Sequence, residues 1–97
     1  MKITHTKTVI ETIINRTVKI EGGPLVKTAL QAYTHTSFRV DAVTFVSREG
    51  HDPHLAIIEG FAVDAQGKPR GENKRYSRAV RRNAWDSASY SWLNELL

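Results

Sequence analysis

The 97-residue chain contains no cysteine. This absence excludes a disulfide framework, a thiol nucleophile and a thiolate metal site. Because small secreted domains often depend on disulfides, we expect a reducing, cytoplasmic compartment. No secretory leader is recognisable at residues 1–7, and the longest apolar run, Leu55–Ile58, is far shorter than the roughly 20 residues that span a bilayer. We therefore expect no membrane partner.

The common catalytic and cofactor motifs are also missing. No Gly-x-Ser-x-Gly elbow surrounds the serines of residues 87–91, and no glycine-rich phosphate loop occurs. His51 and His54 flank an Asp-Pro pair, but no further ligand stands at a zinc-binding spacing. We interpret that segment as a solvent-facing turn, and we expect a protein without catalytic residues, cofactor or metal.

Positive charge, by contrast, is abundant and concentrated. The formal net charge is +4, yet seven cations and a single carboxylate lie within residues 68–82, a local charge of +6. Such a cluster suits nucleic-acid phosphates or an acidic protein surface. The alternative is a solvated surface that only keeps the protein in solution.

The N-terminal segment is rich in β-branched residues. They make up nine of the fourteen residues of Lys7–Ile20, which favours a strand. A short helix is the alternative, because Val9, Ile10, Ile13 and Ile14 also fit a helical stripe. We interpret residues 1–22 as a β-rich N-terminal extension of a single domain spanning residues 1–97, able to pair with the sheet or with a second copy in a homodimer.

The rest of the chain predicts an α-β-β-β-α core over residues 23–97. Pro24 opens an apolar stripe that predicts a helix over 24–34. Strands are predicted at Phe38–Ser47, Leu55–Asp64 and about Arg75–Val80, with a turn at residues 48–54. Ala84, Ala88, Trp92 and Leu96 recur every four residues, which predicts a helix over about 81–97.

Together these elements predict an α+β fold. An antiparallel sheet of three to five strands, in the order β-α-β-β-β-α, would carry both helices on one face. On Phe38–Ser47 we expect Phe38, Val40, Ala42 and Val46 on one face, with Val43 and Phe45 on the other. Trp85, Trp92 and Leu96 should then pack against the sheet together with Val26 and Leu30.

The basic segment is the candidate functional site. Lys74, Arg75, Arg78, Arg81 and Arg82 precede or open the predicted last helix, whose N-terminus would add unpaired N–H groups for a phosphate. Arginine dominates the cluster, which favours bidentate phosphate contacts. Tyr76 could stack on a base.

From Pro24 onward the chain resembles double-stranded-RNA-binding domains. The resemblance rests on the Glu49–His54 turn, the Arg81-Arg82 pair and the small and apolar residues that follow it. It implies that Arg81 and Arg82 grip phosphates, that the turn histidines reach a minor groove and that the first helix touches 2′-hydroxyls. The candidate nucleic-acid-binding residues are Lys68, Arg70, Lys74, Arg75, Arg78, Arg81, Arg82, His51, His54, Lys27 and Gln31.

Two functions are compatible with these features. The first is a small basic module that binds the phosphate backbone of RNA or DNA without catalysis. The alternative is a small phage or mobile-element protein that inhibits a host protein, binding it by charge, on an acidic surface of that partner, or by an added strand edge.

Overall fold

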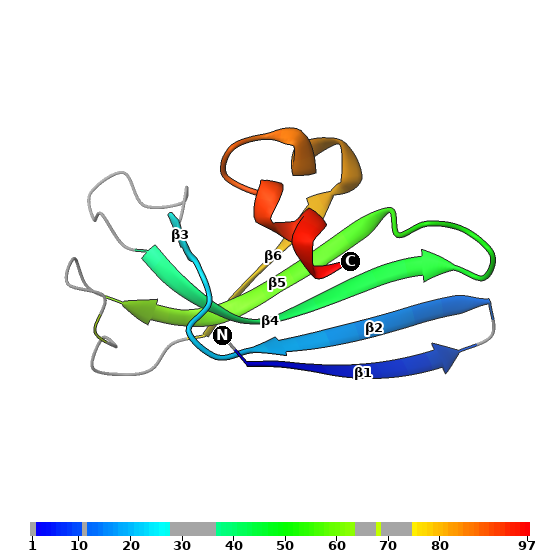
Figure 1. Cartoon of the computed structure of the whole chain (residues 1–97), viewed down its shortest axis with the longest axis horizontal. Coiled ribbons are helices and arrows are strands. Elements are labelled where there is room, and N and C mark those ends of the chain that lie inside the picture. The colour runs from blue at the N-terminus through cyan, green and yellow to red at the C-terminus, as the bar shows by residue number, and fades with distance from the viewer. Residues whose placement is uncertain (1, 11, 28–36, 64–67, 69–74) are drawn as a thin grey trace.

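A computed structural model describes residues 2–10, 12–27, 37–63, 68 and 75–97, and in it these residues form one antiparallel sheet of six strands (Figure 1). Five strands follow the order β1-β2-β4-β5-β6, and β3 pairs with β4 on the same side as β2. The strand bounds are β1 (Ile3–Ile10), β2 (Ile13–Ile20), β3 (Leu25–Lys27), β4 (Ser37–Arg48), β5 (Leu55–Val63) and β6 (Arg75–Arg81).

The predicted α+β layout, with two helices packed on the sheet, is wrong. The described residues contain no α-helix. Residues 25–27, within the predicted helix 24–34, are strand β3, and residues 28–36 lie outside the described part. The predicted C-terminal helix is instead two 3-10 helices, η1 (Arg82–Asp86) and η2 (Ser91–Leu96).

Local hydrogen bonds explain why a continuous C-terminal helix does not form. The Ser87 hydroxyl donates to the Ala84 carbonyl at 2.9 Å, and the Trp92 indole N–H donates to the Ser89 carbonyl at 2.9 Å. Such bonds let side chains compete with the helical backbone ladder. Of the four residues with this spacing, only Leu96 is buried and Ala88 is exposed, so the spacing does not mark one buried helical face.

The N-terminal segment forms a hairpin rather than the single predicted strand. β1 and β2 pair antiparallel, from Ile3 opposite Ile20 to Ile10 opposite Ile13. The sequence at the break, Glu11-Thr12, has neither Gly, Pro nor Asn, so the usual hairpin pattern is missing. β2 is an integral part of the sheet, because it also pairs with β4 and buries Val18.

A bulge in β4 changes which of its side chains share a face. The register with β5 shifts between Val40 and Ala42, leaving Asp41 as the extra residue. Phe38 and Val40 therefore point to the same side as Val43 and Phe45, and each of these four residues is at most 1% exposed. The predicted division of these residues between two faces is wrong for this reason.

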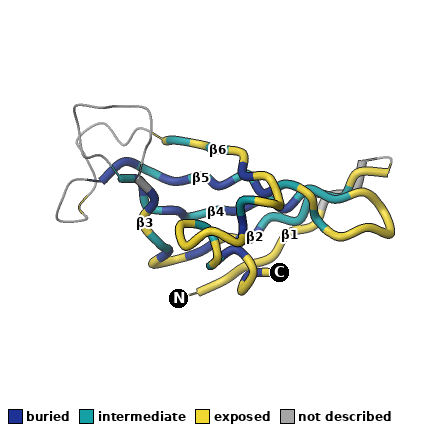
Figure 2. The backbone as a smooth tube through the Cα atoms, turned by 90° about the horizontal axis from the view of Figure 1, so that it is seen from above, coloured by how far each residue is buried: buried dark blue, intermediate teal, exposed yellow. Residues whose placement is uncertain are grey.

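The core lies between the sheet and the two 3-10 helices, which pack on one side of it, here called the covered face (Figures 1 and 2). Trp85 and Leu93 are at most 1% exposed there, and Leu96 is 6% exposed. Trp92 also packs against this core, as predicted, but it is only partly buried. Leu30, predicted to join it, lies outside the described residues.

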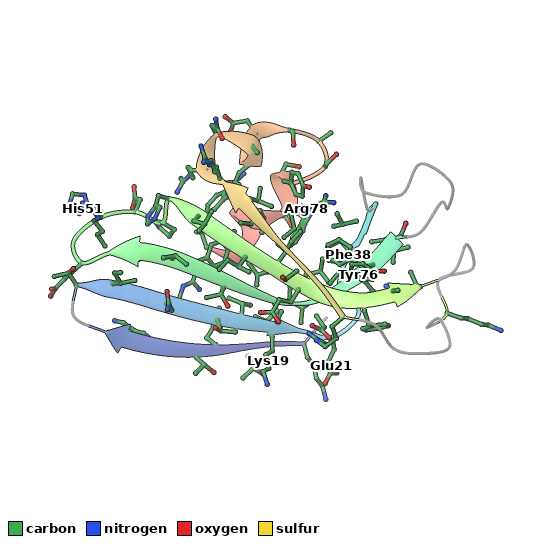
Figure 3. All side chains as sticks on the ribbon, turned by 180° about the vertical axis from the view of Figure 1, so that it is seen from behind. Lys19, Glu21, Phe38, His51, Tyr76 and Arg78 are labelled. Carbon is green, nitrogen blue, oxygen red and sulfur yellow. The ribbon has the colours of Figure 1, made fainter. Side chains whose placement is uncertain are left out.

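The opposite side of the sheet, here called the open face, carries mostly polar residues. Alternation along β2 places Thr17 and Lys19 there, and Thr17 shares a hydrogen bond of 3.0 Å with Thr44 of β4. Figure 3 shows Lys19 pointing away from the 3-10 helices. No described element packs over this face.

Candidate nucleic-acid interface

Strand β6 divides the basic cluster instead of presenting it as one surface. Successive side chains of a strand point to opposite sides, so Arg75 and Arg81 face the open side while Arg78 faces the covered side. Arg75 and Arg81 also lie at opposite ends of β6, about 20 Å apart at the usual strand rise. The three arginines therefore cannot grip one short anionic segment together.

Arg75 is engaged within the sheet. Its guanidinium makes two hydrogen bonds of 2.7 Å to the Asp41 carboxylate at the β4 bulge, and Glu59 lies 3.8 Å away. The Asp41 hydrogen bonds raise the pKa of Arg75 above its ordinary value, so the group stays charged at any working pH. Because two carboxylates already surround it, Arg75 offers little to an incoming phosphate.

The side chains of Arg78 and Tyr76 lie on the covered face and make contacts there. Arg78 donates a hydrogen bond of 2.7 Å to the Tyr90 hydroxyl in the segment between the two 3-10 helices. The Tyr76 ring stacks with Phe38, with ring centroids 6.3 Å apart, and both side chains are labelled in Figure 3. Tyr76 is half-buried and packs on the covered face.

Arg82 joins the end of β6 to the turn between β4 and β5. Its backbone N–H donates to the His54 carbonyl at 3.1 Å, and its guanidinium donates to the Pro53 carbonyl at 3.0 Å. The guanidinium also lies 4.7 Å from the centre of the Trp85 ring, a cation–π distance. These contacts fix the Arg81-Arg82 pair next to the histidine turn, although some thirty residues separate the two segments in sequence.

We call the resulting surface the basic end and define it as Arg48, His51, His54, Arg81 and Arg82. One shallow depression is lined by His54, Arg81, Arg82 and Asn83, among others. A second is lined by Arg48, His51, Asp52 and His54, so His54 is common to both. All five side chains of the basic end are exposed, and Figure 3 shows His51 at the tip of the β4–β5 turn.

The electrostatics of the basic end are positive but mixed. The surface carries three guanidinium groups and two imidazoles, and the turn also carries the exposed carboxylates of Glu49 and Asp52. Within the described residues, no hydrogen bond or ion pair engages the Arg48 or Arg81 side chain. Both remain able to offer a full set of donors in a planar fork, the geometry that matches phosphate oxygens.

The structure brings together only part of the predicted site. His51, His54, Arg81 and Arg82 converge at the basic end, and Arg48 joins them from the last position of β4. Arg48 was not among the predicted site residues, although it is the first residue of the predicted turn. Lys68 is exposed, Lys27 belongs to strand β3 rather than to a helix, and Arg70, Lys74 and Gln31 lie outside the described residues.

The predicted phosphate site at a helix N-terminus is not formed. The element that follows Arg81 is a 3-10 helix of five residues, too short to carry a substantial dipole. The positive charge of the basic end therefore comes from its side chains and not from a helix N-terminus.

Other chemistry is not assembled in the described part of the chain. No group of three or more His, Asp or Glu side chains there comes close enough to hold a metal ion. None of its helices has the length and apolar character that crossing a bilayer demands. Comparison with protein-family models, curated proteins and solved structures finds no match.

Proposed function

We propose that the protein binds the phosphate backbone of nucleic acid through the basic end, without catalysing a reaction, in a reducing cytoplasmic compartment. The observation that carries the proposal is the pair of contacts from Arg82 to His54 and Pro53, which hold the Arg81-Arg82 segment beside the histidine turn. Contacts of this kind position a protein on a nucleic acid without reading its sequence.

Salt dependence is the first expected property of such an interface. Each neutralised phosphate releases counterions, so three arginine contacts give a slope of about −2.7 in log affinity against log salt. A rise from about 50 to about 200 mM salt should then weaken binding roughly 40-fold. Fluorescence polarisation with labelled single- and double-stranded RNA and DNA measures this directly.

A double variant tests whether the basic end is the contact surface. Arg48→Ala with Arg81→Ala removes two cations that have no described partner, and it leaves the Arg82–Trp85 packing intact. We expect the affinity at low salt to fall by about tenfold or more and the salt slope to flatten by about two units, equally for all sequences. The fold should survive, because exposed charges contribute little to stability.

The matched control is Lys2→Ala with Lys19→Ala. Both lysines are exposed and line a depression on the open face together with Arg75, away from the basic end, and this double variant loses the same formal charge. Its affinity should stay within about twofold of the parent. Equal losses in the two double variants would show that net charge, and not this surface, drives binding. If no probe binds even at low salt, the proposal is wrong.

A further inference from the structure

Strand β1 is an edge strand, and none of its residues 3–7 is buried in the core. It pairs with β2 alone, and its residues 3–7 are exposed on both faces of the sheet. Figure 2 shows β1 in the colour of exposed residues, separated by β2 from β4 and β5, which carry many buried residues. The ladder with β2 runs through all eight residues without a bulge, and β1 has no proline. Such an edge is a template for another strand.

Two hydrogen bonds establish which backbone groups of β1 point outward. The Glu21 N–H donates to the Lys2 carbonyl at 3.0 Å, so residues 2 and 21 form a hydrogen-bonded pair. Because such pairs alternate along an antiparallel ladder, the even-numbered residues of β1 bond to β2. The Glu49 N–H donates to the Thr12 carbonyl at 2.8 Å, so residues 12 and 49 also form a hydrogen-bonded pair. The even-numbered residues of β2 therefore bond to β4, and its odd-numbered residues bond to β1. The outward groups are those of Ile3, His5, Lys7 and Val9.

We propose that β1 pairs antiparallel with β1 of a second copy about a two-fold axis at Thr6. In this register His5 lies opposite Lys7 of the other copy, so the outward N–H and C=O groups of both strands meet in hydrogen-bonded pairs. Thr6 lies opposite Thr6, a favourable cross-strand pair, and no lysine faces a lysine. The two six-stranded sheets then continue as one. This inference does not depend on the proposed nucleic-acid binding.

Charge and symmetry favour a second copy in this arrangement over a pairing between β1 and the other edge. β6 carries Arg75, Arg78 and Arg81, so joining it to the Lys7 edge would place cations against cations. A β1–β6 contact would also leave both remaining edges open and would build filaments, whereas a two-fold contact closes. The antiparallel arrangement further sends the two basic ends in opposite directions, which limits their repulsion.

The absence of cysteine makes the register directly testable. In a non-hydrogen-bonded antiparallel pair the Cα atoms lie about 4.5 Å apart, within the range that a disulfide spans. Thr6→Cys should therefore form a covalent dimer under mild oxidation. Thr4→Cys is the matched control, because its two copies would lie about 13 Å apart along the strands at the usual rise.

We expect Thr6→Cys to cross-link about tenfold faster than Thr4→Cys, because pairing raises the effective thiol concentration. In the parent, the amides of His5 and Lys7 should exchange with solvent more slowly as protein concentration rises, and sedimentation should show a concentration-dependent dimer. Equal cross-linking rates for the two variants would overturn the register. A parent that stays monomeric, with fast exchange at both amides at every concentration, would overturn the dimer itself, and neither result bears on the test of the basic end.

Discussion

Replacing Trp85 with alanine should cost about 3–5 kcal/mol, enough to unfold much of the population of a domain this small. Trp85 is 1% exposed, and its ring packs edge-to-face on Phe45 with centroids 5.5 Å apart. The truncation also leaves the Val80 carbonyl without its 3.1 Å indole donor and removes the ring under Arg82. Urea unfolding followed by far-ultraviolet circular dichroism measures the change.

Trp92→Ala is the matched control, since it removes the chain's other tryptophan. Trp92 is half-buried, and its indole bonds within its own segment, to Ser89. We expect a cost of about 1–2 kcal/mol for this change. If Trp92→Ala lowered the stability as much as Trp85→Ala, the C-terminal segment would bury a different side against the sheet from the one described.

Gly60→Ala should be the most destabilising single-methyl change in the sheet. A Cβ at Gly60 would lie 2.0 Å from the Arg39 carbonyl oxygen and 3.0 Å from the Phe38 ring. The obstacle is backbone of the neighbouring strand, so β4 and β5 must move apart near the Phe38–Tyr76 stack. We expect a loss of about 3 kcal/mol, or a melting temperature lower by roughly 12–24 °C.

Gly50→Asn provides the comparison for Gly60→Ala. Gly50 has a φ of +79° in the β4–β5 turn, and a Cβ there meets no atom within 4 Å. Asparagine tolerates this left-handed conformation, so the stability should change by only about 0.5 kcal/mol. If the Gly60→Ala protein had the same melting temperature as the Gly50→Asn protein, β4 and β5 would be less closely spaced at Gly60 than described.

Strands were easier to predict here than helices because their patterns are local. Alternating β-branched and aromatic residues placed strands at β4, β5 and β6 within a few residues, and those strands are present. The hairpin of β1 and β2 was missed because its break carries no turn residue. Asp41 gives no sign in the sequence that it forms a bulge, so the faces of β4 were assigned wrongly.

The prediction of a C-terminal helix was wrong for a different reason. The i, i+4 spacing pointed to Ala84, Ala88, Trp92 and Leu96 as one apolar face. The residues that the two 3-10 helices bury are instead Trp85, Leu93 and Leu96. The serines that interrupt them favour local side-chain bonds over helix, and that preference outweighs the spacing. Because that helix does not form, the phosphate site predicted at its N-terminus does not form either.

The sequence predicted which residues belong to the candidate site, but not how they are arranged in space. The sequence singled out Arg81, Arg82, His51 and His54 separately, and only the fold shows that they adjoin. Alternation along the predicted strand of residues 75–80 implied that Arg75 and Arg78 face opposite sides, whereas Arg81 was assigned to the predicted helix and is in fact the last residue of β6. Their partners, Asp41 and Tyr90, are distant in sequence and could not be inferred from spacing.

The most direct test of the proposed function is an amide chemical-shift titration of the parent protein with a short RNA or DNA duplex at low salt. If the basic end is the interface, the largest shifts will fall in residues 48–54 and 81–83, and they will reverse as salt is added. Shifts concentrated around Lys2, Lys19 and Arg75 on the open face, with residues 48–54 and 81–83 unmoved, would contradict it.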